Sequence, residues 1–280
     1  MSMLADTALS EGPGALGVLA FRGIDAARFL QGQLSADIEK LAPGSGTLAG
    51  LHNAQGRAIA LLALARSGTD EILAALPAEL LDTVAQRLRK YVLRAKVRVD
   101  DVSAAVHVIG TTSAPADASV ARVSWGRRHL LFVPAGQAPV SAGTRDRWNL
   151  EDLREGLPQI FVATSEQFVA QMLNLDLLGA IAFDKGCYTG QEVIARAHYR
   201  GRVKRRMQRW LNPHGSPLEP GDVAHSTDGR TLTVVRAAPS DEGREVLAVG
   251  NFSPAAEESA GRREGVELSG PLPLPYALPE

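Results

Sequence analysis

This 280-residue chain is organised around the stretch Asp184-Lys185-Gly186-Cys187-Tyr188-Thr189-Gly190-Gln191-Glu192. It holds the chain's only cysteine, and apolar runs flank it on both sides. Gly186 and Gly190 permit a positive φ or a close approach of a ligand, which a Cβ would prevent. We therefore expect a tight polar turn between two packed elements, where a thiol is exposed to solvent.

The cations near Cys187 bear on the chemistry of its thiol. Nearby positive charge favours the thiolate, which is the nucleophilic and metal-binding form of cysteine. Over residues 185–209 eight Lys and Arg side chains stand against the single carboxylate of Glu192, in a chain of net charge −1. Cys187 and its nearest cation, Lys185, are therefore candidate catalytic residues. The alternative is that Cys187 is a small buried hydrophobe, the common role of a lone cysteine.

The segment Lys185–Glu192 resembles the signature of the YgfZ-type folate-binding proteins. These are relatives of the tetrahydrofolate-dependent aminomethyltransferase (T-protein) of the glycine cleavage system. Four further segments resemble the family in the same order: Phe29–Asp37, Leu51–Arg57, Asn174–Asp176 and Tyr199–Gly201. The resemblance implies an α+β fold, a T-protein-like ring of subdomains with antiparallel sheets and packed helices, plus a small C-terminal β-barrel. It places a folate-binding region of two intertwined subdomains at 1–200 and the barrel at 201–280.

The resemblance also implies a function. It is that of a folate-binding accessory protein that supports assembly or repair of iron–sulfur clusters in client enzymes, tRNA-modifying ones included. Cys187 would be the reactive or transiently ligating thiol, tetrahydrofolate or a derivative the cofactor, and iron–sulfur client or assembly proteins the partners. The alternative is an enzyme, a tetrahydrofolate-dependent aminomethyltransferase or other one-carbon transferase.

One departure from the aminomethyltransferase relatives bears on that alternative. In those relatives a glutamate two residues before a glycine contacts the pteridine ring. Here the matching segment is Leu153-Arg154-Glu155-Gly156, so that Arg154 occupies the glutamate's position. No residue matches the relatives' catalytic aspartate. The departure favours the accessory role over one-carbon transfer.

A reduced folate presents a pteridine ring, an aminobenzoyl body and one or more glutamates. Its site therefore needs carboxylates or amides, an apolar slot and cations. The candidate folate-binding residues are Gln31, Asp37, Asn174, Asp184, Tyr188, Gln191, Glu192, Arg196, Arg200 and Arg202. Two alternatives stay open: the polar residues 31–37 also suit a solvated helix end, and the arginine run also suits a solvated strand face.

Composition narrows the class of protein. A mass of 29.7 kDa with 45% apolar residues is enough for a full core, and a single cysteine suits a reducing compartment. The histidines are scattered without an i, i+4 pair, so we expect no metal site. The first residues lack the basic region of a signal peptide, and the longest apolar run, Ala58–Ala65, is far below the ~20 residues of a membrane helix. We expect a soluble, cytoplasmic protein without membrane partners.

Two further expectations concern partners and local structure. Aromatic residues are sparse among the arginines, which argues against direct nucleic-acid binding. Hydropathy periods predict helices over 25–34, 77–90 and 144–155. They predict strands over 18–21, 47–52, 57–66, 71–76, 94–102, 106–109, 120–125, 129–133, 203–211, 231–237 and 245–251, and an extended strap over 270–280.

Overall fold

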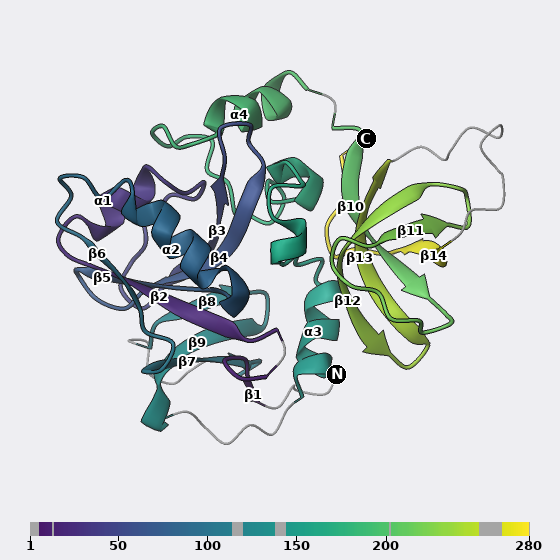
Figure 1. Ribbon diagram of the computed structural model, residues 1–280, viewed down its shortest axis with the longest axis horizontal. Coiled ribbons are helices and arrows are strands. Elements are labelled where there is room, and N and C mark those ends of the chain that lie inside the picture. The colour runs from purple at the N-terminus through teal and green to yellow at the C-terminus, as the bar shows by residue number, and fades with distance from the viewer. Residues whose placement is uncertain are drawn as a thin grey trace.

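The computed structural model describes residues 6–12, 14–113, 120–137, 144–201, 203–251 and 265–279. Within these ranges the chain forms two packed antiparallel sheets, short helices and a closed barrel. Figure 1 shows the sheets and their helices on one side of the molecule and the barrel, made of the last strands, on the other. The predicted α+β class with a small C-terminal barrel is confirmed. No helix in the described ranges is both long and apolar enough to span a bilayer.

The central sheet has five strands in the order β3-β4-β5-β2-β6. They are β2 (Leu16–Arg22), β3 (Gly46–His52), β4 (Ala58–Arg66), β5 (Glu71–Pro77) and β6 (Arg98–Asp101). Helices α1 (Ala26–Gln31) and α2 (Leu81–Arg89) pack on one face of this sheet. The buried positions of α2 are Leu81, Val84, Ala85 and Leu88. Their spacing is the i, i+3, i+4, i+7 pattern of an amphipathic helix.

Both faces of the central sheet are buried, which explains why its strands are almost continuously apolar. In β4, Leu62 and Leu64 belong to the core beneath the helices. The alternate residues Ala63 and Ala65 belong to a second core, on the opposite face. Small side chains on this second face allow another sheet to pack closely against it.

That second sheet has the order β1-β7-β9-β8. Its strands are β1 (Thr7–Ala8), β7 (Val106–Thr111), β8 (Arg122–Trp125) and β9 (Arg128–Pro134). Helix α3 (Arg145–Arg154) starts at Thr144, whose hydroxyl accepts the backbone N–H of Arg147 at 3.3 Å. Trp148 of α3 covers this sheet at Gly110, where an added Cβ would lie 2.7 Å from the indole ring. The glycine therefore lets α3 approach the sheet.

The barrel closes in the order β10-β13-β12-β11-β14, with β14 pairing back to β10. Its strands are β10 (Arg205–Asn212), β11 (Val223–Ser226), β12 (Thr231–Ser240), β13 (Gly243–Asn251) and β14 (Val266–Leu272). The ring of Trp210 is fully buried in the barrel core. Closure leaves this sheet without an exposed edge.

A buried ion pair fixes the barrel against the rest of the fold. Asp176 accepts two hydrogen bonds from the guanidinium of Arg206 on β10, both at 2.8 Å. Asn174, in the left-handed conformation, donates its side-chain amide to the carbonyl of Met207 at 2.9 Å. A bidentate guanidinium–carboxylate pair constrains orientation as well as distance. The segment 174–176 is therefore the joint between the two halves of the molecule.

Several predicted elements need correction. The helices predicted at 25–34, 77–90 and 144–155 exist with shorter bounds, the middle one as a 3₁₀ turn (Ala78–Leu80) followed by α2. The strand predicted over 94–102 begins only at Arg98, because turns occupy the preceding residues. The strand face considered for the arginine run is wrong for Arg196, which lies on a helix, α4 (Gln191–Tyr199), and Arg200 caps this helix. The sequence did not predict β1, β11, β14 or α4. The domain boundary at residue 200 stays a prediction.

Candidate functional site

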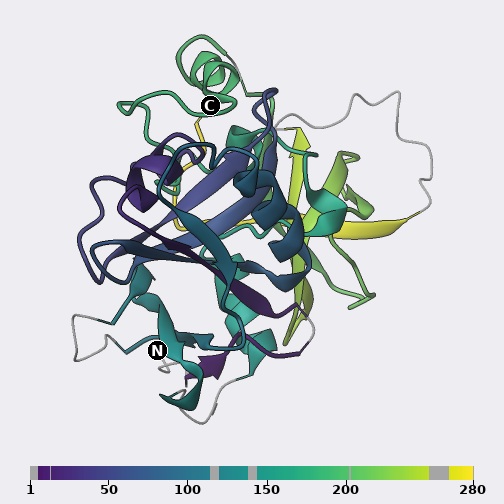
Figure 2. The same ribbon diagram turned by 60° about the vertical axis from the view of Figure 1, so that its left-hand side comes forward.

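The loop that contains the cysteine, residues 184–190 (the motif loop), leads into α4 and rests on the tip of the β3–β4 hairpin (Figures 1 and 2). At Gly190, which has φ 84°, an added Cβ would lie 2.4 Å from the carbonyl oxygen of Asn53. At Gly56 it would lie 3.1 Å from the side chain of Val193. The loop can sit this close to the hairpin because both positions are glycine. Gly186 has a negative or extended φ and open space around it, so the constraint expected there is absent.

Lys185 points to the C-terminal end of α1. Its ammonium donates three hydrogen bonds of 2.7 Å, to the carbonyl oxygens of Gln31, Leu34 and Ala36. An ammonium has three N–H donors, so all of them are used on backbone carbonyls. Burial lowers the pKa of Lys185 to about 8, while nearby carboxylates act to raise it. Lys185 thus fastens the motif loop to α1, and a catalytic role for it stays a prediction.

Cys187 is exposed, which confirms the predicted open turn and rules out the buried alternative. Asp184 in the same loop has a side chain that is 79% exposed, and it pairs with Lys40 at 3.6 Å. On α4, the side chains of Arg196 and Arg200 are exposed as well. A partner molecule can therefore reach the sulfur and these charges directly. Among the described residues, no group of three His, Cys, Asp or Glu side chains is placed to hold a metal ion.

Tyr188 anchors the loop beneath Cys187. Its ring is buried, lies 6.4 Å from the ring of His52 on β3, and faces the ammonium of Lys185 at 5.1 Å. Burial raises the pKa of the Tyr188 phenol to about 12. His52 is fully buried, and neither of its ring nitrogens has a hydrogen-bond partner in the described ranges. Burial lowers the pKa of His52 to about 4, so the imidazole is neutral at pH 7.

The polar residues after α1 form a self-paired network. The amide of Gln31 donates to Asp37 at 3.0 Å, and its carbonyl accepts the backbone N–H of Ile38 at 2.7 Å. Lys40 binds Asp37 at 2.8 Å, and this hydrogen bond holds the pKa of the Asp37 carboxyl below its ordinary value. The network lies beside the carbonyls that Lys185 binds, so these residues help to position the segment on which the motif loop packs.

The structure brings most of the sequence-predicted site residues together around the motif loop. Those at this end are Gln31, Asp37, Asp184, Lys185, Cys187, Tyr188, Gln191, Glu192, Arg196 and Arg200. It separates Asn174 from them, since that side chain is fully buried at the barrel joint. Arg202 lies outside the described residues. Folate contacts by any of these residues stay predictions.

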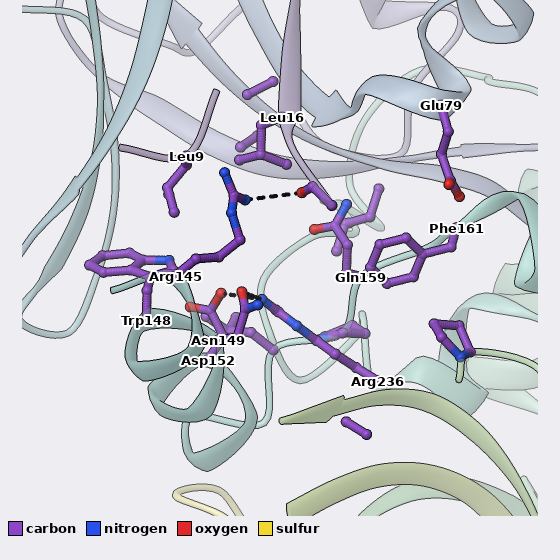
Figure 3. A pocket seen from close by; sticks show the side chains of 18 of the residues that line it. Leu9, Leu16, Glu79, Arg145, Trp148, Asn149, Asp152, Gln159, Phe161 and Arg236 are labelled. Atoms are coloured by element: carbon purple, nitrogen blue, oxygen red, sulfur yellow. Dashed lines mark hydrogen bonds and ion pairs between the residues drawn. The ribbon is translucent and has the colours of Figure 1, made fainter. Parts of the chain in front are cut away.

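A cavity of about 610 Å³ lies elsewhere, enclosed by α3, both sheets and the barrel. Figure 3 shows Arg145, Trp148, Asn149 and Asp152 projecting into this region from α3, with Arg236 reaching it from the barrel strand β12. The sequence-predicted site residues that the structure describes are absent from its lining. The predicted residues and the cavity are therefore two separate features of the molecule.

The cavity wall is aromatic and carries buried polar atoms that lack partners. Trp125, Trp148 and Phe161 supply its planar faces. Trp125 Nε1 and Gln159 Nε2 are buried donors without an acceptor among the described residues. An unsatisfied buried donor costs about 1–3 kcal/mol. Both donors belong to residues that line the same cavity, so this wall holds polar groups that the described part of the protein leaves unpaired.

Asp152 joins three parts of the cavity wall. Its carboxylate pairs with Arg128 of β9 at 2.7 Å and with Arg236 of β12 at 2.9 Å. Arg236 also donates to the side-chain oxygen of Asn149 at 2.6 Å. The guanidinium of Arg128 stacks on Trp148 at 3.8 Å, a favourable cation–π contact. These pairings fix the positions of the polar groups around the cavity.

Arg154, which replaces the relatives' glutamate, has a structural contact. It donates two hydrogen bonds to Glu245 of β13, at 3.0 and 2.8 Å. It also pairs with Glu151 one turn earlier on α3, at 3.3 Å. The residue is absent from the cavity lining. Arg154 therefore holds the barrel to α3.

Sequence reasoning missed the cavity residues because they come from distant segments. Arg145, Trp148 and Asp152 lie on a helix that was predicted, but Gln159 follows it in a loop and Arg236 lies on a barrel strand. The signal that pointed there was the family-like segment at 153–156, which lies next to Asp152 in the sequence.

Comparison with known proteins identifies the family. The chain is 31% identical over 305 residues to the tRNA-modifying protein YgfZ of Cronobacter sakazakii, covering 92% of this chain and 90% of that protein. The chain belongs to the YgfZ family. The YgfZ protein of Edwardsiella ictaluri is 32% identical over 297 residues, covering 91% and 88%. An uncharacterized protein of Haemophilus influenzae is 32% identical over 193 residues, covering 68% and 69%. No protein-family model matches the chain.

The fold of this YgfZ family member is that of the T-protein. Aminomethyltransferase T of the glycine cleavage system from Bartonella henselae superposes with a TM-score of 0.68 over 92% of this chain and 81% of that one. The two sequences are only 14% identical, so the likeness concerns the fold alone. It confirms the predicted T-protein-like architecture.

Lys185→Met should destabilise the fold, because three backbone carbonyls lose their donor. We expect the free energy of unfolding to fall by about 1–3 kcal/mol in urea denaturation, with faster amide hydrogen exchange across residues 184–190. Lys40→Met is the matched control, since that side chain is 71% exposed, and surface pairs contribute below about 1 kcal/mol. Equal effects of the two substitutions would contradict the role of Lys185 in holding the motif loop to α1.

Stability should depend on the protonation of His52. The unfolded chain binds a proton near pH 6.5, whereas the folded chain does so only near pH 4. The unfolded state therefore binds more protons between these values, so the free energy of unfolding falls as pH is lowered from 6.5 to 4, by up to about 1.4 kcal/mol per pH unit. His52→Leu should flatten the curve measured by urea denaturation. His214→Gln, at an exposed site, should leave it unchanged.

Proposed function

We propose that this YgfZ family member binds tetrahydrofolate or a derivative in the 610 Å³ cavity and acts in the cytoplasm as an accessory protein. Its task is to support assembly or repair of iron–sulfur clusters in client enzymes, tRNA-modifying ones included, with Cys187 as the thiol that meets the client. Support comes from the family, whose named relatives are tRNA-modifying proteins, and from the fold of a folate-dependent type of enzyme, the aminomethyltransferase.

The observation that carries the folate assignment is the pair of buried donors without acceptors, Trp125 Nε1 and Gln159 Nε2. A pteridine ring offers a carbonyl oxygen and ring nitrogens as acceptors, and it is planar enough to lie against Trp148 or Phe161. A cavity of about 610 Å³ falls in the usual range of small-molecule sites, roughly 300–1,000 Å³. The residues present therefore fit the cofactor.

The charged residues of the wall suit the other end of a folate. Arg244 lines the cavity, and its buried Nε lacks a partner in the described ranges. A guanidinium is the preferred donor to a carboxylate, such as that of the glutamate moiety. Arg145 is less available, since it already donates to the carbonyls of Gly14 and Glu11, at 3.0 and 2.6 Å. When bound, folate would supply a one-carbon acceptor or redox protection, while these side chains orient it and exclude water.

The pairing of Asp152 favours the accessory role over one-carbon transfer. Asp152 is the buried carboxylate of the cavity lining, and Glu79 and Glu219 are exposed there. Because two arginines already neutralise Asp152, it is a poor general base for deprotonating an amine. The cavity is better equipped to bind a folate than to turn over a substrate on it.

The position of the thiol supports a macromolecular partner. Cys187 is exposed in the loop that leads into α4, and Arg196 on α4 and Arg200 directly after it are exposed as well. A client can approach the sulfur without entering the cavity. An exposed thiol is chemically suited to attack or to hold a partner transiently, because the partner can reach the sulfur.

Gln159→Leu tests the folate site. The substitution removes an unpartnered donor, so we expect the free energy of unfolding to stay equal or rise. Affinity for tetrahydrofolate or its stable 5-formyl derivative should fall about tenfold, the equivalent of one lost hydrogen bond. Calorimetry measures the affinity, and quenching of Trp125 and Trp148 fluorescence gives a second readout.

The controls for this experiment are Glu192→Gln and Arg196→Gln in the motif region. Unchanged folate affinity in both would place recognition in the cavity. If these variants lost affinity while Gln159→Leu kept it, the sequence-derived assignment would hold and the cavity assignment would be wrong.

Cys187→Ala tests the thiol separately. The side chain is exposed, so folding and folate affinity should stay within about twofold of the parent chain. In a strain that lacks its own YgfZ protein, the variant should fail to restore the activities of iron–sulfur enzymes, whereas the parent chain restores them. Full restoration by the alanine variant would show that the thiol is not required, and the folate proposal would be unaffected.

A further inference from the structure

A second surface, formed by α1 and the segment that follows α2, carries features that the proposed function does not use. Three exposed large apolar side chains belong to the two segments that meet here: Ile24 is 65% exposed, Tyr91 49% and Leu93 89%. Ile24 precedes α1, and the other two follow α2. The segments touch, because Lys96 N–H donates to Asp25 at 2.7 Å. Clustered exposed apolar side chains mark interaction sites more often than scattered ones do.

Between these segments lies a groove of about 380 Å³. Asp25, Arg28, Phe29 and Gln33 line it from α1 and its flanks, and Arg94 and Ala95 line it from the segment after α2. A concave site of this size can accept a side chain or two of a partner, which a flat surface cannot.

We call Ile24, Tyr91 and Leu93 the apolar rim, because they lie within three residues of the lining residues Asp25 and Arg94 in the sequence. The exposure of two of them follows from the backbone. Val92 and Ala95 pack against the main core, and the N–H of Ala95 donates to the carbonyl of Val92 at 3.2 Å. With these two residues facing inward, Tyr91 and Leu93 are held outward. A rim fixed in this way is preorganised, so a partner would lose little entropy in ordering it.

The charge of the groove is positive. Arg28 and Arg94 are both exposed, and in the described part of the chain neither guanidinium has a hydrogen bond or ion pair. The carboxylate in the lining, Asp25, already accepts the N–H of Lys96. Unpaired arginines beside an apolar surface suit a ligand that carries carboxylates next to apolar side chains.

We propose that this groove, with Ile24, Tyr91 and Leu93 as its rim, docks a segment of a partner protein in which acidic and large apolar residues alternate. The apolar side chains of the partner cover the rim and enter the groove, and its carboxylates pair with Arg28 and Arg94. None of the residues that line the groove belongs to the motif loop or to the cavity lining, so the inference does not rest on the folate and thiol assignments.

The test uses the full chain and two blocked pentapeptides, one alternating glutamate with phenylalanine and leucine, the other with lysine in place of glutamate. Titration followed by amide chemical shifts should show the acidic peptide perturbing residues 24–33 and 91–96, while the basic peptide perturbs neither. Arg94→Glu and Leu93→Glu should each weaken the acidic peptide by about tenfold or more. Val223→Glu, at a barrel side chain that is 57% exposed, is the matched control and should bind as the parent does.

Other results would overturn the proposal. Equal binding of both peptides, or binding of neither, would show that the groove does not select acidic partners. Binding to vesicles containing phosphatidylglycerol, with loss in Leu93→Glu and no peptide binding, identifies a membrane surface instead. A parent chain that sediments as a dimer, with Leu93→Glu a monomer, identifies a second copy as the occupant.

Discussion

The carboxylate of Asp152 is the constraint on which the arrangement around the cavity depends. From α3 it binds Arg128 of the second sheet and Arg236 of the barrel at the same time. All three side chains are nearly buried, so each charge is stabilised only while its partners are present. Removing one partner from such a set leaves an uncompensated buried charge, which costs several kcal/mol. The cavity keeps its shape because three separate parts of the chain share one anion.

The β3–β4 hairpin connects this cavity to the motif loop. Leu48 and Leu61 of the hairpin line the cavity, while Asn53 and Gly56 at its tip support Gly190 and α4. Leu61 is five residues from Gly56, or about 16 Å along an extended strand. β4 is buried on both faces, so the hairpin is a stiff spacer. Cavity and loop are thus held at a set separation, which suits a protein whose ligand and thiol serve different partners.

Local patterns predicted the parts of the fold that are locally determined. The turn at Asn53–Gly56, the buried run of β4 and the start of α3 each follow from residue type and spacing. β14 escaped prediction because it pairs in parallel with β11, a contact between distant segments. α4 escaped prediction because its polar residues, Arg196 among them, suit any exposed element. Lys185 was read as a neighbour of the thiol on sequence distance alone, whereas its length lets it reach carbonyls about 150 residues earlier in the chain.

For the candidate site too, the sequence predicted what local residues determine and did not predict what depends on contacts between distant segments. Exposure of Cys187 followed from its setting among glycines and charges, and the structure confirmed it. The cavity could not be inferred, because its wall exists only once α3, two sheets and the barrel have assembled. Its two orphaned donors are a property of that assembly. Each costs about 1–3 kcal/mol, a sizeable share of the 5–15 kcal/mol by which a domain is stable. A ligand that offers acceptors removes this cost on binding, so the interactions that select the ligand would also stabilise the fold.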